Sequence, residues 1–248
     1  MVIRKSDREL ALMREAGTIV GITLARLEEQ IKPGITTAEL DALAYETATQ
    51  HGARPSFLGY RGFPASLCVS VNEQLVHGIP GPRVLEEGDI VSMDFGAIYK
   101  GYQGDAAITV GVGKIGKLAQ EVIETTRGAL QAGIGQARRG NYLGDISWAI
   151  QSCAETRGFS VVRQYVGHGI GREMHEDPQI PNYGQPGRGI LLKPGMTFAL
   201  EPMVNVGTHL TRVLEDDWTV VTEDDALCAH FEHTIAVTNG VAEILTRL

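Results

Sequence analysis

Apolar residues recur along the chain with two spacings, one typical of helices and one typical of strands. The helical spacing covers residues 6–29 and 34–52, and each segment is bounded by turn-forming residues. Each begins with a capping box, formed by Ser6 and Glu9 in the first and by Thr36 and Glu39 in the second. Shorter apolar stretches such as LEEGDIVSMD and LKPGMTFALE predict strands, so the pattern predicts an α+β fold.

The sequence also resembles itself at an offset of 106 to 107 residues. The matching segments are helices at 6–29 and 114–135, helices at 34–52 and 140–158, and strands at 85–94 and 192–201. Because several elements agree in order and spacing, we favour a true repeat over coincidence between common patterns. Two halves, approximately 7–112 and 113–248, would then pack about a pseudo-twofold axis within a single catalytic domain, 1–248. Asp94 and Glu201 would be equivalent and would meet where the halves join.

Asp94 and Asp105 lie on either side of FGAIYKGYQG, which predicts a β-hairpin. A turn centred between Tyr99 and Lys100 would place the two aspartates directly opposite each other, with Cβ atoms roughly 4.5–5.5 Å apart. Two carboxylates at that distance repel unless a cation lies between them. Carboxylates of this kind bridge the paired ions of two-metal hydrolases. The hairpin therefore predicts one wall of a dinuclear metal site.

Further candidate ligands occupy segments that are otherwise apolar or rich in glycine. Glu201 ends MTFALE, Glu232 begins a strand in HFEHTIAV, and His168 lies in VGHGIG, which we expect to be a loop. For any single carboxylate, an exposed position on a strand face is the alternative. The four carboxylates and one neutral imidazole sum to −4, which two divalent cations would neutralise. Oxygen ligands with one nitrogen suit manganese, iron, cobalt or zinc.

The remaining histidines divide into candidates and others. His77 closes an alternating segment, VSVNEQLVHG, expected to be a strand, and His175 follows His168 by seven residues. A structural, hydrogen-bonded role is the alternative for each. His233 is a candidate for orienting Glu232 by a hydrogen bond. His51 and His209 suggest no function.

Composition narrows the class of protein. Of 248 residues, 43% are hydrophobic, and no apolar run approaches the length of about 20 that a membrane span needs. Three widely spaced cysteines and no signal-peptide pattern at the N-terminus predict a cytoplasmic protein without disulfides. The net charge of −8 argues against nucleic acid as a partner.

Five segments together resemble the type I methionine aminopeptidases, which are metallopeptidases of family M24 with the pita-bread (creatinase/aminopeptidase) fold. The resemblance spans nearly the whole chain and rests on SVNEQLVHGIP, GDIVSMDFGAIYKGYQGD, GHGIGREMHEDP, LKPGMTFALEPM and FEHTIAVT. It implies a curved antiparallel sheet covered by helices, in two pseudo-twofold-related halves. It also implies removal of the N-terminal methionine from nascent proteins and peptides, with preference for a small second residue.

By that resemblance, two divalent ions (Co, Mn, Fe or Zn) would be held by Asp94, Asp105, His168, Glu201 and Glu232. Asp105 and Glu232 would bridge the ions, and a metal-bridging hydroxide would attack the first peptide carbonyl. The catalytic residues would be Glu201, His175 and His77, with Glu201 moving the proton and both histidines contacting the substrate. The methionine pocket would be lined by Tyr60, Phe63, Cys68 and Trp218.

Three residues depart from the family pattern around that pocket: Phe57, Phe63 and Met174. Two other functions stay open. An Xaa-Pro peptidase of the same fold usually carries a further N-terminal domain, and a binding protein that has lost catalysis typically loses ligands. We expect a monomer, and we expect such an enzyme to meet nascent chains in transient association with the ribosome.

Overall fold

The computed structural model describes residues 2–247. Four α-helices and one short 3₁₀ helix are present in that range. Ser6 and Thr36 cap the first two α-helices through the predicted capping boxes with Glu9 and Glu39. The helices are α1 (Asp7–Gln30), α2 (Thr37–Gln50), η1 (Tyr60–Gly62), α3 (Lys117–Gln136) and α4 (Leu143–Glu155).

The strands form one large sheet and two small ones, and every strand pair within residues 2–247 is antiparallel. The large sheet runs β1-β4-β5-β14-β9-β7-β8, with β2 beside β4 and β15 beside β14. Its strands are β1 (Arg54–Pro55), β2 (Cys68–Val71), β4 (Ile90–Tyr99), β5 (Tyr102–Gly111), β7 (Gly167–Gly169), β8 (Glu176–Ile180), β9 (Thr197–Leu200), β14 (Glu232–Ala236) and β15 (Glu243–Ile244). The small sheets contain β13 (Cys228–His230), β10 (Met203–Asn205) and β6 (Ser160–Val161), and β11 (Thr211–Val213), β12 (Val220–Thr222) and β3 (Gln74–Val76).

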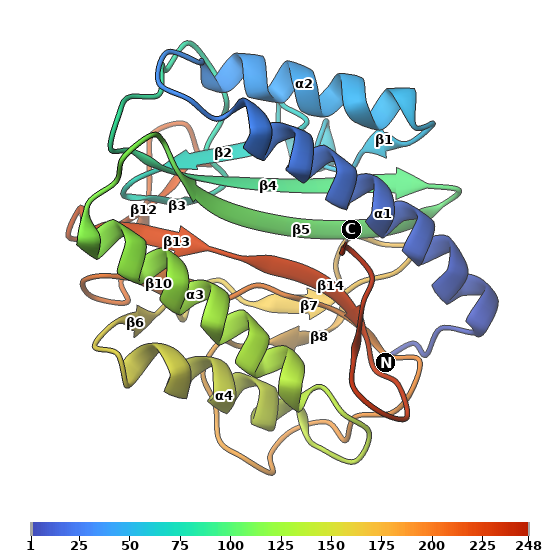
Figure 1. Cartoon of the computed structure of the whole chain (residues 1–248). Coiled ribbons are helices and arrows are strands. Elements are labelled where there is room, and N and C mark those ends of the chain that lie inside the picture. The colour runs from blue at the N-terminus through green and yellow to red at the C-terminus, as the bar shows by residue number, and fades with distance from the viewer. Residues whose placement is uncertain (1, 248) are drawn as a thin grey trace.

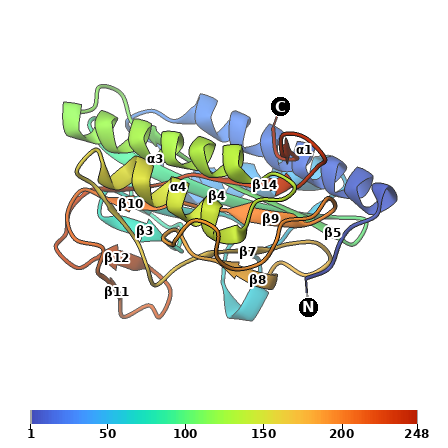
Figure 2. The ribbon, with the colours of Figure 1, turned by 90° about the horizontal axis from the view of Figure 1, so that it is seen from below.

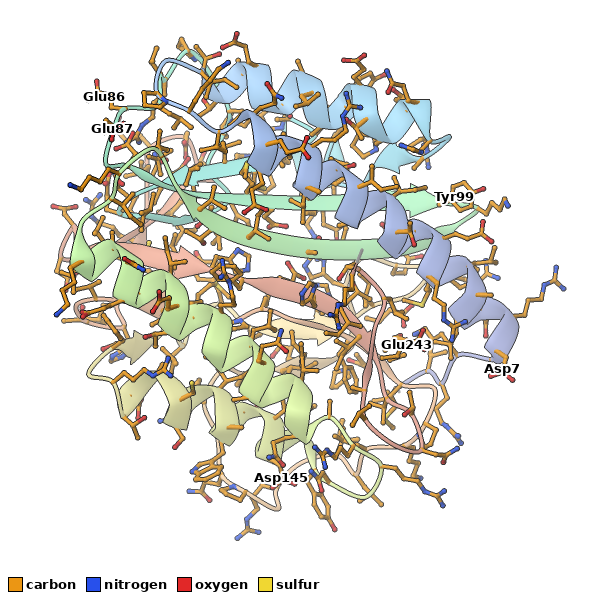
Figure 3. The ribbon with its side chains drawn as sticks, viewed as in Figure 1. Asp7, Glu86, Glu87, Tyr99, Asp145 and Glu243 are labelled. Atoms are coloured by element: carbon orange, nitrogen blue, oxygen red, sulfur yellow. The ribbon has the colours of Figure 1, made fainter. Side chains whose placement is uncertain are left out.

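The helices gather on one side of the large sheet. Helices α1 and α2 lie along one half of the molecule and α3 and α4 along the other (Figure 1). Seen from below, β3, β11 and β12 lie on the side of the sheet away from the helices (Figure 2). Figure 3 shows Asp7 in the first turn of α1 and Asp145 in the first turn of α4. An acidic side chain at a helix N-terminus interacts favourably with the helix dipole.

The internal repeat appears in the backbone pairing. Thr36 forms an isolated β-bridge with Val84, directly before α2. Tyr142 forms the equivalent bridge with Leu191, directly before α4. The strand of each half begins shortly after a glycine with positive φ: Gly88 (φ 99°) precedes β4 and Gly195 (φ 87°) precedes β9. These pairs keep the predicted offset, so the fold has two pseudo-twofold-related halves. The single-domain boundaries remain a prediction.

The β4–β5 hairpin forms, but its predicted register is wrong. Asp94 lies opposite Ala107, and Asp105 lies opposite Gly96. The turn is Lys100–Gly101, with φ values of 48° and 81°, and positive φ at both central residues is what a two-residue type I′ turn requires. Because the error is two residues, both aspartates stay on the same face of the sheet as diagonal neighbours.

Other predicted boundaries shift by a few residues. Helix α3 starts at Lys117 instead of Lys114, after the extended N-cap Gly116. The segment VSVNEQLVHG is two strands, β2 and β3, joined by a turn in which Asn72 has φ 60°. Backbone NH of Val69 donates to the carbonyl of Gly78 (2.9 Å), which folds β3 back along β2. A hairpin and one strand share the same alternation, so the pattern did not separate them.

Candidate active site

One cavity of about 140 Å³ brings together residues from several strands of the large sheet and from the loops beside them. All eleven candidate site residues from the sequence line it, although they come from segments far apart in the chain. Phe57 and Arg61 complete the lining. The lining residues are Phe57, Tyr60, Arg61, Phe63, Cys68, His77, Asp94, Asp105, His168, His175, Glu201, Trp218 and Glu232.

The five candidate ligands lie on consecutive strands of the sheet. Asp94 is in β4, Asp105 in β5, Glu232 in β14, Glu201 directly after β9, and His168 in β7. Their order in the sheet is β4-β5-β14-β9-β7, so each ligand sits beside the next. Side chains alternate between the faces of a sheet, which places all five on the same face.

A row of paired residues explains how the acids meet. Ala107 of β5 lies opposite Asp94 on one side and opposite Glu232 on the other. Its small side chain leaves space between the two carboxylates. Asp105, two residues before Ala107 on β5, points the same way. The three acids therefore converge around Ala107.

The carboxylates lie in a buried setting that disfavours their charge. Burial raises the pKa of Asp94 to about 7. The pKa values of Asp105, Glu201 and Glu232 lie well above the ordinary range, first because of burial and then because of the neighbouring acids. Metal-free, the cluster would hold protons that a solvent-exposed carboxylate would have lost.

Only one ring nitrogen of His168, Nε2, is available to bind a metal ion. Its Nδ1 lies 2.9 Å from the carbonyl oxygen of Gly169, to which it donates as the protonated nitrogen. Its Nε2, left with a lone pair, lies 3.5 Å from Glu201 Oε1. Burial, followed by His175, lowers the pKa of His168 to about 3, so the ring is neutral. The segment is a short buried strand and not the predicted loop, because Gly167 and Gly169 pair with β8 and β9.

His175 lies between Tyr60 and His168. The Tyr60 hydroxyl lies 2.8 Å from His175 Nδ1, and the two rings stack at 5.6 Å between centroids. The His168 ring is 4.2 Å away, centroid to centroid. Burial, and then the Arg61 guanidinium, lower the pKa of His175. If the neutral ring accepts the hydroxyl proton at Nδ1, its own proton lies on Nε2.

His77 lies on the other side of the cavity, in a left-handed backbone conformation with φ 59°. Its ring meets the edges of Tyr165 and Trp218, at 5.8 and 6.4 Å between centroids. Burial lowers its pKa to about 4. His77 is therefore a neutral ring held between aromatic walls.

The apolar end of the cavity is built from aromatic rings and a thiol. Phe63 and Trp218 meet edge to face with centroids 5.1 Å apart. Cys68 lies opposite Asp94 in the β2–β4 pair, and burial raises the pKa of its thiol. Phe57 lines the cavity, whereas Met174 is buried beside Tyr102 and does not line it.

Comparison with known proteins decides the family. The model of metallopeptidase family M24 matches residues 11–239. Methionine aminopeptidase 1 of Bacillus subtilis is 55% identical over 248 residues, covering 100% of each chain. The chain belongs to metallopeptidase family M24. The crystal structure of methionine aminopeptidase from Thermotoga maritima has a TM-score of 0.99 and 47% identity, covering 100% of each chain. Prolidase from Pyrococcus furiosus has a TM-score of 0.82 at 23% identity, covers 99% of this chain and 66% of its own, and shares the fold.

As an M24 enzyme of the methionine aminopeptidase group with the pita-bread fold, the chain needs a divalent metal site, and the cavity fits one. Ligand atoms of Asp105, His168 and Glu232 lie within 4.8 Å of one another. The buried oxygens Asp94 Oδ1, Asp105 Oδ1 and Glu232 Oε1 have no hydrogen-bond partner. Among residues 2–247, no lysine or arginine forms an ion pair with the cluster. This buried set of oxygen and nitrogen donors therefore fits divalent cations.

One residue near the ligands was missed by the sequence analysis, and one was misassigned. His233 Nδ1 bonds Thr246 Oγ1 (2.8 Å), and its position next to Glu232 puts it on the opposite face of β14. The predicted contact of His233 with Glu232 is therefore wrong. Instead His230 Nε2 lies 4.0 Å from Glu232 Oε2, and both ring nitrogens of this buried histidine lack partners among residues 2–247. The sequence held a signal for this contact, because residues two apart in an extended chain, such as His230 and Glu232, point to the same side.

No helix within residues 2–247 is long and apolar enough to cross a membrane.

Proposed function

We propose that this M24 enzyme removes the N-terminal methionine from proteins and peptides, with preference for a small second residue. The observation that carries the proposal is the convergence of all eleven candidate residues on one cavity. The relatives named above, similar over the full length, are methionine aminopeptidases.

The cavity would hold two divalent ions, from among cobalt, manganese, iron and zinc. Asp105, His168, Glu201 and Glu232 would hold one, and Asp94 would hold the other, with Asp105 and Glu232 shared. Such ions, when bound, supply Lewis-acid chemistry that makes water nucleophilic near neutral pH. Four carboxylates and one neutral imidazole match the charge of two such ions.

The protein's own groups would move the proton and steady the charge. Glu201 takes the proton of the attacking water and delivers it to the leaving amine. His175, protonated on Nε2 because Tyr60 occupies Nδ1, donates to the carbonyl oxygen as negative charge grows there. His77 holds the peptide nitrogen or the second residue. Asp94, with the ion that it would hold, would receive the free α-amine, so that only a chain terminus would fit.

The methionine side chain would lie between the aromatic walls and the thiol of the apolar end. A thioether makes favourable contacts with aromatic edges, and Phe63 and Trp218 offer both a ring face and an edge. Phe57 takes part in this wall, which is where the chain departs from the family pattern. The pocket stays apolar despite the departure.

The decisive experiment is a peptide panel assayed after chelation and stepwise metal return. Release of methionine from Met-Ala peptides, with no cleavage of Xaa-Pro peptides, is the expected result. Asp105→Asn should lose activity and metal binding together. Asp7→Asn, the same substitution at the exposed start of α1, should lose neither. Full activity of Asp105→Asn, or of metal-free protein, would refute the proposal.

We further propose that the enzyme works in the cytoplasm as a monomer and meets nascent chains during transient association with the ribosome. The three cysteines are free, which suits a reducing compartment. Cosedimentation with translating ribosomes and light scattering of the purified protein test the two statements.

A further inference from the structure

The segment before α1 reaches across the fold to the turn that carries His175. Lys5 is buried, and its ammonium pairs with the carboxylate of Glu176, the residue after His175. The side chains of Lys5 and Glu176 are 4% and 9% exposed. Backbone NH of Lys5 donates to the carbonyl of Gly195 (2.6 Å), which fixes the segment against the second half. An ion pair this far from water joins residues 171 positions apart in sequence.

Glu176 uses its second oxygen to close the turn. Its Oε1 accepts from the backbone NH of Arg172 at 2.9 Å. A Cβ placed on Gly171 would lie 2.4 Å from both Lys5 Cε and Glu176 Oε1, so the ion pair packs directly on the turn backbone. The carboxylate thus ties the two ends of residues 172–176 together, and Lys5 holds that carboxylate in place.

The other side of the turn is fixed by β5. Backbone NH of Gln103 donates to the carbonyl of Gly171 (2.8 Å), and its side-chain amide donates to the carbonyl of Arg172 (3.4 Å). Within the turn, the backbone NH of Gly171 donates to the carbonyl of Glu173 (3.1 Å), and His175 directly precedes Glu176. The imidazole then has a single hydrogen bond among those within residues 2–247, to Tyr60.

Stability is a weak reason for burying this pair. An isolated buried ion pair often stabilises no more than apolar residues of similar volume, because both ions must be desolvated. What the pair supplies is a fixed position for Glu176 and hence for the neighbouring His175. Displacement of a catalytic group by about 1 Å can lower the rate by about 10²-fold.

We propose that Lys5 is a positioning residue for catalysis: through Glu176 it sets the turn that aims His175 Nε2 at the substrate carbonyl. The inference rests on the role proposed above for His175. It assigns a function in the reaction to the segment before α1, of which residues 2–6 contribute no lining residue to the cavity.

A double-mutant cycle tests this directly. Lys5→Met, which keeps the length of the side chain, should lower kcat about 10- to 100-fold with KM changed less than twofold. In a His175→Ala background, the same substitution should lower kcat less than twofold further, because the group it positions is gone. Arg4→Met is the matched control, since exposed Arg4 contacts Pro194 and not the turn. It should leave kcat unchanged.

Two further measurements separate positioning from folding or metal binding. Bound metal per chain should stay unchanged in Lys5→Met. The second measurement is the ring ¹⁵N chemical shifts of His175 in metal-free protein. They should show that Nδ1 no longer accepts the hydrogen bond from Tyr60 in Lys5→Met, and that it accepts this bond again in Lys5→Arg. Should Lys5→Met not fold, Glu176→Gln replaces it, because the amide oxygen can still accept from Arg172.

Equal losses of kcat in both backgrounds would overturn the proposal, as would loss of metal together with activity. A His175→Ala variant with full activity would instead refute the proposed role of His175. It would not affect the result of the peptide panel with metal return, which tests the proposed function separately.

Discussion

The hydrogen bond between Tyr60 and His175 offers a sharp test of the site. The Tyr60 hydroxyl lies 2.8 Å from Nδ1, and no other side-chain hydrogen bond within residues 2–247 orients the ring. Tyr60→Phe removes the hydroxyl and keeps the aromatic ring that stacks on His175 at 5.6 Å. The substitution therefore frees the tautomer of His175 with little change in the shape of the cavity.

The size of the effect follows from the bond that is lost. A hydrogen bond between neutral groups stabilises by about 0.5–1.5 kcal/mol net. At about 1.4 kcal/mol per factor of ten, kcat should fall about 2- to 10-fold. KM should change less than twofold, because the donation by Nε2 strengthens only as charge grows on the carbonyl oxygen. His175→Ala, which removes the donor altogether, should lose about 10²–10³-fold.

Steady-state kinetics on a Met-Ala peptide with metal at saturation measures these changes. Tyr165→Phe is the control, because Tyr165 meets His77 with its ring and lies apart from His175. It should retain kcat within twofold. If Tyr60→Phe keeps the full kcat, the hydroxyl does not set the tautomer of His175 and the assignment of Nε2 as donor is wrong.

Three further predictions concern stability. For metal-free protein, the folded pKa of Asp94, about 7, exceeds its usual 3.8, so the folded state binds more protons and the free energy of unfolding should fall as pH rises between those values. Thermal unfolding after chelation measures this, and an equal fall in metal-loaded protein or in Asp94→Asn would contradict it. Glu9 has its pKa lowered from 4.5 to about 2, chiefly by the backbone NH of Ser6 and the Tyr102 hydroxyl. Its contribution is therefore complete above pH 4.5 and is lost as pH falls through about 2, so Glu9→Gln should be less stable by about 1 kcal/mol near neutral pH, and the difference from the parent should shrink as pH falls toward 2. Asp41 accepts from the backbone NH groups of Ser66 and Leu67 (2.8 and 2.9 Å) just before β2. Asp41→Ala should therefore lower the free energy of unfolding by about 2 kcal/mol in urea, and no change would show that water replaces the carboxylate.

Local signals in the sequence predicted the elements well, because their causes are local. The capping boxes of α1 and α2 need only residues three apart, and both form as expected. The predicted register of β4 and β5 was wrong by two residues, because the register depends on which two turn residues adopt positive φ. Gly101 was an evident candidate, and Lys100 was not. An even error keeps the face, which is why the predicted ligand set still converged.

Contacts between distant segments were outside the reach of the sequence pattern. Tyr60 was expected only as a wall of the pocket, and nothing along the chain indicated its bond to His175. His230 was overlooked and His233 chosen, because adjacency in sequence was weighed above the alternation of faces along β14. The fit of Lys5 to Glu176 likewise depends on the tertiary fold.

The supports of His175 come from four segments that are far apart in the sequence. Tyr60 belongs to η1, Gln103 to β5, His168 to β7, and Lys5 to the segment before α1. The proposed metal ligands, in contrast, lie on or directly after adjacent strands of the large sheet, and the pairing of these strands brings them together. The cluster should therefore bind metal whenever the sheet is intact, whereas the rate should depend on the N-terminal segment as well. Variants at Lys5 are expected to separate the two properties, retaining metal while losing kcat, and ligand variants such as Asp105→Asn are expected to lose both.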